Sequence, residues 1–500
     1  MVLHKRPTFL IAPVTAALIL LAAGTVRSAG VSAATEECLG CHEEVTPGIV
    51  GDWRASRHAK VTPAEALRKP ALERRVSAAA APEGLAETVV GCAECHTRNA
   101  DKHADSFEHN GHRVHIVVSP EDCAACHPVE REQYAGNLMA NAHGNLQGNP
   151  VYHTLAEAVN GVTAFDGEKL GPAATDALTD ADSCLSCHGT KVEVKGLKPR
   201  DTAMGEMTFP VLGGWPNQGV GRINPDGSKG ACTACHARHQ FSIEMARKPK
   251  TCSQCHKGPD VPAYAVYVVS KHGNIYDSLE SKWDFSAVPW SPGEHFTAPT
   301  CATCHVSLLA SGGDVIAERT HRMGDRSAWR IFGLVYAHPH PASADTTTLK
   351  NAAGLPLPTE LTGEPVAAGL IGKEEQGARE GRMRKICQSC HSRQWVEGHY
   401  EKFARTIETT NAMTLAATKV MLRAWDKGLA GGLAQGDSIF NEALERKWVS
   451  QWLFYANSTR YASAMGGADY GVFANGRHRL SANLRELLDH VRFLESSREK

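Results

Sequence analysis

One short pattern, Cys-x-x-Cys-His, recurs eight times along this chain and uses all sixteen of its cysteines. The units are Cys38/Cys41/His42, Cys92/Cys95/His96, Cys123/Cys126/His127, Cys184/Cys187/His188, Cys232/Cys235/His236, Cys252/Cys255/His256, Cys301/Cys304/His305 and Cys387/Cys390/His391. A single Cys-x-x-Cys is also typical of a zinc knuckle or a redox dithiol. Eight copies, each followed by histidine and with no cysteine left over, argue against both.

The repeated unit is the attachment signature of c-type haem. Two thiols bind the porphyrin covalently, and the adjacent imidazole becomes an axial ligand of the iron. We therefore expect eight covalently bound haems, each with one iron ligand from its own unit. Low-spin electron-transfer haems commonly take a second imidazole on the distal side. Candidates for that role are His58, His143 and one of the pair His112 and His115.

Haem density predicts the fold class. If the first 34 residues are removed, about 58 residues serve each haem, too few for a separate hydrocarbon core around each one. Aromatic residues make up only 6% of the chain, which agrees with porphyrins filling the interior. We expect a mostly α-helical multihaem cytochrome c, with a closely packed haem core wrapped by helices and long loops. Residues 35–395 form the predicted haem-binding region.

Residues 396–500 form the predicted C-terminal helical region. Residues 399–427 contain no glycine or proline, and their apolar side chains recur at helical spacing. A second helix follows near 440–452, and a last one covers 484–494, with a leucine face that we expect to pack on the chain's own core rather than on another subunit. Tyr470 lies in the turn-rich link before that last helix, on a predicted outward loop. Elsewhere, 189–235 and the proline-rich 337–370 predict long surface loops.

The N-terminus has the layout of a secretory signal peptide. Basic residues precede an apolar run and then small residues, so residues 1–34 are expected to be cleaved after Ala34 and the protein to be periplasmic. The alternative, an uncleaved anchor, is disfavoured because the run is short and contains Pro13. No second run predicts a transmembrane anchor in the mature chain. The net charge of -1 gives no indication of nucleic-acid binding, and the haem propionates would suit a basic redox partner.

Longer stretches resemble the octahaem hydroxylamine oxidoreductase family. They read CTACHARHQF, CSQCHKGPD, SKHG, TCATCHVS, HRMGDR and CQSCHS, and the resemblance covers essentially the whole mature chain. From about Asp182 the pattern is also similar to the pentahaem nitrite reductases. The family leaves its fourth haem open on the distal side, which implies an open iron opposite His188. The seven distal ligands then implied are His58, His112 or His115, His143, His239, His272, His321 and His399.

Two further family features bear on chemistry. The family places an Asp-His pair over the open iron, as GPDHP, whereas this chain has Asp260 followed by Val261. A carboxylate there accepts protons from a bound substrate, and the missing histidine puts the proton relay in doubt. Oxidative members also link a tyrosine of a neighbouring subunit to the active haem, and distortion of the macrocycle tunes its potential. Tyr470 lies in the matching region, which implies a crosslink and a homotrimer.

The resemblance implies a small nitrogenous substrate. The leading hypothesis is hydroxylamine oxidation at the haem of His188, with Asp260 assisting proton removal and electrons leaving to a c-type cytochrome or a quinone-linked partner. Three alternatives remain: reduction of nitrite or hydroxylamine to ammonium, hydrazine oxidation, and a non-enzymatic electron conduit whose irons all have two histidine ligands.

Overall fold

The computed structural model describes residues 30–173, 175–202 and 204–498. Most of the predicted signal peptide therefore lies outside the described residues. Its predicted cleavage point falls in the first turn of α1 (Ala33–Val45), where the Ser32 side chain caps the helix by accepting a hydrogen bond from the Thr35 amide at 3.1 Å. In the described part of the chain, no helix combines the length and the apolar character needed to cross a membrane.

The attachment units fold as single helical turns. In four of them the histidine amide donates a hydrogen bond to the carbonyl of the first cysteine, at 2.9 or 3.0 Å. Residues three and four positions apart on a helical turn share a face, so this turn directs both thiols and the imidazole to the same side. The four units that show this bond begin at Cys123, Cys232, Cys252 and Cys387. Others lie in α4 (Cys92–His96), α10 (Cys184–His188) and α15 (Cys301–His305).

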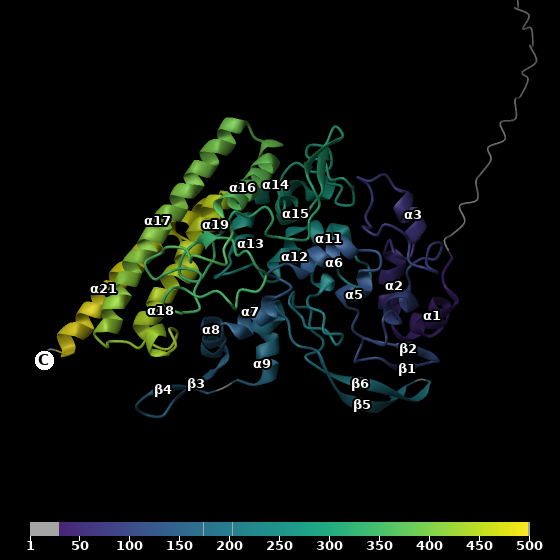
Figure 1. Cartoon of the computed structure of the whole chain (residues 1–500), viewed down its shortest axis with the longest axis horizontal. Helices are drawn as coiled ribbons and strands as arrows, with labels where there is room; N and C mark the ends of the chain where they lie inside the picture. Colours follow the sequence, from purple (N-terminus) through teal and green to yellow (C-terminus); the bar gives the residue numbers. More distant parts are fainter. Residues whose placement is uncertain (1–29, 174, 203, 499–500) are drawn as a thin grey trace, which may run out of the picture.

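Short helices and hairpins surround these units (Figure 1). The N-terminal and central helices are α2 (Pro47–Ala55), α3 (Pro63–Arg68), α5 (Pro120–Cys123), α6 (Pro128–Ala135), α7 (Ala142–Gly148), α8 (Pro150–Asn160), α9 (Ala177–Asp182), α11 (Ile243–Arg247), α12 (Pro249–Ser253), α13 (Ala263–Val268), α14 (Lys271–Leu279) and α16 (Lys373–Gln388). Most have fewer than twelve residues and are marginal alone. Packing against the centre of the molecule must hold them.

The strands form five separate antiparallel hairpins in the described residues. They are β1 (Phe107–His109) with β2 (His112–Val114), β3 (Val162–Phe165) with β4 (Leu170–Ala173), β5 (Glu193–Thr202) with β6 (Gly205–Gly213), β7 (Leu309–Ser311) with β8 (Asp314–Ala317), and β9 (Trp329–Arg330) with β10 (His338–Pro339). The β5–β6 hairpin corrects the expectation of a long loop over 189–235. β5 is mostly exposed and β6 mostly half-buried, and both strands contain proline, which weakens a strand prediction from sequence.

A helical bundle closes one end of the molecule, at the left of Figure 1. It contains α17 (Arg393–Asp426), α18 (Ala443–Val449), a π-helical turn (Ser450–Ala456), α19 (Asn457–Met465), α20 (Ala468–Val472) and α21 (Arg477–Arg498). Leu487 and Val491 of α21 pack in the same buried cluster as Trp448 and Trp452. The apolar face of the last helix therefore packs on the chain's own core, as predicted. The predicted boundary at 396 falls within the first turn of α17.

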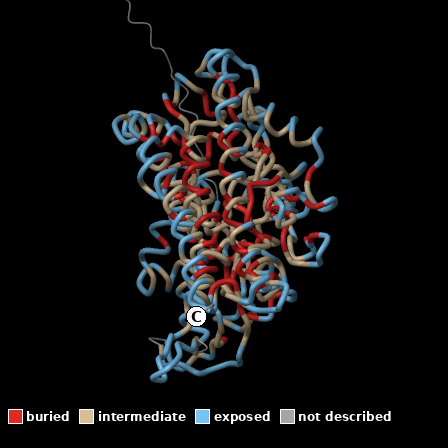
Figure 2. The backbone as a smooth tube through the Cα atoms, turned by 90° about the vertical axis from the view of Figure 1, so that its left-hand side faces the viewer, coloured by how far each residue is buried: buried red, intermediate tan, exposed pale blue. Residues whose placement is uncertain are grey.

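The proline-rich segment 337–370, predicted as a surface loop, is partly buried. His338 is 1% exposed and Leu357 is fully buried. The Tyr336 hydroxyl, just before this segment, donates to the Leu361 carbonyl at 2.8 Å and lies 3.1 Å from the Thr418 hydroxyl of α17. Prolines exclude a helix here, but they do not prevent extended chain from packing against one. Figure 2 shows the buried residues along the middle of the molecule, with exposed residues around them.

Candidate haem-binding site

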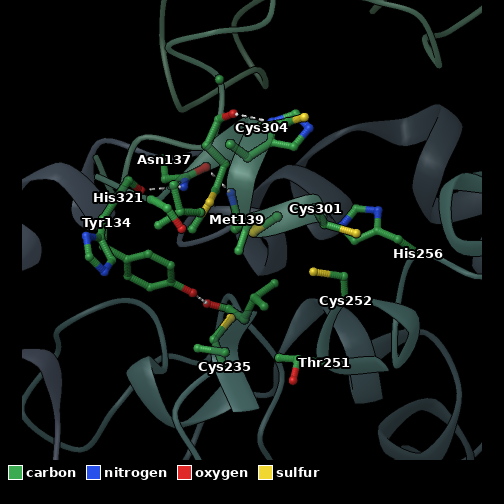
Figure 3. Close-up of a pocket in the computed structure, with 18 of the residues that line it drawn as sticks. Tyr134, Asn137, Met139, Cys235, Thr251, Cys252, His256, Cys301, Cys304 and His321 are labelled. Atoms are coloured by element: carbon green, nitrogen blue, oxygen red, sulfur yellow. Dashed lines mark hydrogen bonds between the residues drawn. The ribbon is translucent and has the colours of Figure 1, made fainter. Parts of the chain in front are cut away.

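A continuous cavity of about 1460 Å³ passes through the centre of the molecule. Small-ligand pockets occupy about 300 to 1,000 Å³, so this space exceeds the need of one small ligand. Cysteines from seven of the eight units line it, all except the unit of Cys38 and Cys41. Figure 3 shows Cys235, Cys252, Cys301 and Cys304 around one part of the hollow, with His256 and His321. All sixteen thiols are free of disulfides, and this donor set fits covalent haem attachment.

Neighbouring units form a connected series. Four pairs of thiols lie close enough to shift one another's pKa: Cys38 with Cys92, Cys123 with Cys232, Cys187 with Cys255, and Cys252 with Cys301. Cys95 also lies near Cys126, Cys235 near Cys252, and Cys304 near Cys387. The series runs through the first, second, third, fifth, sixth, seventh and eighth units. The fourth unit, which ends in His188, touches the sixth and forms a side branch.

Five pairs of imidazoles lie at the spacing expected of two ligands on one iron. Two rings that bind one metal from opposite sides, with bonds of about 2 Å, hold their centres roughly 6 Å apart. The observed separations are 6.2 Å for His42 and His109, 6.5 Å for His96 and His239, 6.4 Å for His127 and His58, 6.5 Å for His236 and His321, and 6.0 Å for His391 and His272. The structure thus brings His58, His239, His272 and His321 opposite motif histidines, which fits the ligand role predicted for each.

The first unit brings a histidine that was not predicted to the facing position. His109 faces His42, whereas His112 hydrogen-bonds Glu37 at 2.7 Å on the surface. The ring of His115 is also close to a motif histidine, 6.0 Å from His96. However, its Nε2 donates to a backbone carbonyl at 2.9 Å, its ring stacks on His103 at 3.7 Å, and His239 already faces His96. Neither predicted candidate is placed as a distal ligand. The Asn110-Gly111 pair signals the β1–β2 hairpin in the sequence, but only its packing on α1 selects His109.

Two other predicted ligands lie away from such a pair. His143 Nδ1 donates to the Gly189 carbonyl at 2.7 Å, directly after the fourth unit. His399 stacks on Trp395 at 5.3 Å, and Trp395 in turn stacks on His391 at 4.0 Å. Their ligand roles stay predictions. Sequence reasoning also passed over His340, which lines the cavity and whose pKa burial lowers to about 3. Its position between prolines gave no signal of burial.

The fourth unit differs from the five paired ones. His188 Nδ1 faces the Ala142 carbonyl at 3.4 Å, which leaves Nε2 as the ligand atom. Burial lowers the pKa of His188, so the ring is held neutral, as metal ligation requires. Among the described residues, no second imidazole lies at pair spacing from His188; the same is true of His256 and His305. His188 shares its cavity with Asp260.

Asp260 and Val261 lie between the fourth unit and α19. The backbone carbonyl of Asp260 accepts a hydrogen bond from Asn457 at 3.0 Å. Val261 packs against an apolar cluster that contains Val266 and Tyr461. The position that holds a histidine in the resembled family is therefore an apolar contact in this chain. A proton relay through that position is absent.

Tyr470 lies in helix α20 rather than on a loop. Its side chain packs against the cluster of Val266 and Tyr461, and its carbonyl accepts a hydrogen bond from Ser458 at 3.2 Å. In the chain as described, Tyr470 is thus a packing residue of its own subunit. The crosslink predicted for it remains a prediction.

Comparisons with known proteins agree with this donor set. Three family models match parts of the chain: "Seven times multi-haem cytochrome CxxCH" over residues 224–325, "Cytochrome c7 and related cytochrome c" over 172–257, and "Cytochrome c554 and c-prime" over 37–117. A solved structure named "hypothetical multiheme protein" is 42% identical, covers 95% of this chain and 98% of its own, and superposes with a TM-score of 0.88. The chain belongs to the multihaem cytochromes c.

Two more distant relatives of this cytochrome come from Kuenenia stuttgartiensis. A "probable nitrite reductase-hydroxylamine oxidoreductase fusion protein" is 26% identical over 367 residues, which are 71% of the cytochrome and 34% of the relative. The cytochrome thus spans about a third of that relative's length. A structure of a "reducing HAO-like protein complex" covers 93% of the cytochrome and 86% of its own chain, with a TM-score of 0.59 and 19% identity. This second likeness shows a shared fold.

Proposed function

We propose that this cytochrome is a periplasmic octahaem oxidoreductase that reduces nitrite or hydroxylamine to ammonium at the site formed by Cys184, Cys187 and His188. One observation carries the proposal. His188, which lacks a facing imidazole among the described residues as His256 and His305 do, belongs to the one unit on a side branch of the series, where a terminal reaction site would be expected. Its cavity also contains the carboxylate of Asp260.

The residues of the fourth unit have separable roles in this proposal. A c-type haem with an open axial position supplies a binding site for a small nitrogen ligand and exchanges electrons one at a time. The contact of His188 with the Ala142 carbonyl fixes which ring nitrogen faces the cavity. Asp260 transfers protons, since reduction of nitrite to ammonium takes up protons along with electrons. The connected series of units stores and delivers those electrons.

The reductive direction is favoured by two features. Tyr470 packs within its own chain, so the structure gives no support to the crosslink that characterises oxidative members of the resembled family. Val261 removes the second proton acceptor that oxidation would use. The printed name of one Kuenenia stuttgartiensis relative joins a nitrite reductase to a hydroxylamine oxidoreductase, and that of the other describes a reducing complex. Hydroxylamine oxidation is the second candidate, because Asp260 retains its place in the Gly-Pro-Asp stretch. A homotrimer and a c-type cytochrome or quinone-linked electron donor complete the proposal.

The direct test supplies the purified holoprotein with reduced viologen and either nitrite or hydroxylamine. We expect ammonium as the product from both. A second assay offers hydroxylamine with an oxidised electron acceptor. If the second assay shows fast hydroxylamine oxidation and the first assay yields no ammonium, the enzyme works in the oxidative direction instead. If none of the irons binds nitrite, nitric oxide or carbon monoxide, the protein would instead be a non-enzymatic electron conduit.

A further inference from the structure

Arg330, in β9, is one of three arginines that line the central cavity and form no ion pair or side-chain hydrogen bond with the described residues; the other two are Arg57 and Arg98. Arg330 lies over the ring of Phe332, with Cζ 4.8 Å from the ring centre. By contrast, the guanidinium of Arg460 makes four hydrogen bonds of 2.7 to 3.2 Å. A guanidinium offers five donors, and those of Arg330 are available to a ligand.

A tyrosine hydroxyl lies in the same part of the cavity. Tyr461 is 8% exposed and lines the cavity, and its hydroxyl has no hydrogen bond to the described residues. Its ring stacks on Phe332 at 6.1 Å with an interplanar angle of 25°. Burial raises the pKa of Tyr461, Arg330 opposes this rise, and Asp260 adds to it. Phe332 links the two groups, because Arg330 lies over its ring and Tyr461 stacks on it, and Asp260 and His188 line the same cavity.

Helix α19 holds these groups in place. Asn457 donates to the Asp260 carbonyl at 3.0 Å, and Arg460 donates to the Ile331 carbonyl at 3.2 Å, one residue after Arg330. Asn457 Oδ1 accepts from Arg460 at 3.2 Å, which couples the two anchors. A π-helical turn directly precedes Asn457, and such turns occur frequently at functional sites. One helix thus fixes two cavity segments relative to each other.

We propose that Arg330 and Tyr461 form an oxyanion-binding pocket beside His188, which selects nitrite-like substrates over neutral ligands. This inference rests on the proposed function and names its substrate class. Guanidinium groups bind small planar oxyanions through charge-assisted hydrogen bonds, and the tyrosine hydroxyl adds a further donor. The carboxylate of Asp260 weakens anion binding because it carries a like charge. Its role in this proposal is to supply protons. The pocket therefore predicts effects of opposite sign at Arg330 and Asp260.

The test measures ligand binding rather than turnover. The oxidised holoprotein is titrated with nitrite, an anion, and with nitric oxide, a neutral ligand, and both are followed by the optical spectrum. We expect Arg330→Gln to weaken nitrite binding about 10- to 100-fold, the loss of one charge-assisted contact, with nitric oxide affinity within about twofold. Arg330→Lys should recover part of the loss, Tyr461→Phe should weaken nitrite less, and Asp260→Asn should tighten it. Arg57→Gln is the matched control, since Arg57 lines the cavity beside His58.

Each outcome separates this inference from the proposed function. Unchanged nitrite affinity in Arg330→Gln, with a shift only in haem potential, would assign Arg330 to a haem propionate and overturn the inference. An equal loss in Arg57→Gln would overturn it as well, because the effect would then be general to the cavity charge. If the unmodified protein binds neither nitrite nor nitric oxide, the proposed function itself fails.

Discussion

Replacement of His109 by alanine tests the arrangement of the first unit. The centres of the His109 and His42 rings lie 6.2 Å apart. This matches the separation of about 6 Å expected for two imidazoles that bind one metal from opposite sides. Loss of His109 should convert one of the eight expected haems from six-coordinate low-spin to five-coordinate. About one seventh of the low-spin electron paramagnetic resonance intensity should therefore be lost, because the open haem of His188 does not contribute to it. Carbon monoxide uptake by the reduced protein should rise by one equivalent per chain.

His112→Ala and His115→Ala are the matched controls for this change. His112 lies in the same hairpin but pairs with Glu37, and His115 stacks on His103. Neither control should change the low-spin intensity or carbon monoxide uptake. If His112→Ala or His115→Ala leaves an iron five-coordinate and His109→Ala does not, the ring-spacing argument is refuted for this unit. The other four assigned pairs would then need the same test.

Three further predictions concern residues away from the first unit. Glu445 is fully buried against Trp425, and burial raises its pKa from 4.5 to about 8. The neutral acid is the favoured form, so stability should be fully present below pH 4.5 and fall as pH rises through 8. Glu445→Gln should remove this fall, with a gain of up to about 4 kcal/mol above pH 8 in denaturant unfolding. Tyr470→Phe should leave both the haem spectrum and the denatured subunit mass unchanged; a lost mass shift would instead establish the crosslink. Asp260→Asn should slow ammonium formation without loss of haem, and unchanged turnover across pH would remove Asp260 from the mechanism.

Much of the site could be predicted from local sequence because the attachment unit is itself local. The two thiols and the imidazole of each unit come from one helical turn, so spacing alone locates them. Helical periodicity likewise located α17 and the packed face of α21. These features depend on residues a few positions apart, where sequence patterns are informative.

Features that depend on distant segments could not be predicted in this way. The choice of His109 depends on how the β1–β2 hairpin packs on α1, and no local pattern separates it from His112. The side-branch position of the fourth unit arises from the contact of Cys187 with Cys255. Arg330 and Tyr461 are 131 positions apart in the sequence, and neither belongs to a motif. Only the hydrogen bonds of α19 show that they share a site.

The central claim is that one iron, at His188, has an open position while the other seven are closed by imidazoles. Titration of the dithionite-reduced holoprotein with carbon monoxide measures this directly, because the ligand binds only where an axial position is free. The account predicts one equivalent per chain. Zero equivalents would contradict it and favour an electron conduit, and two or three would show that the irons of His256 or His305 are open as well.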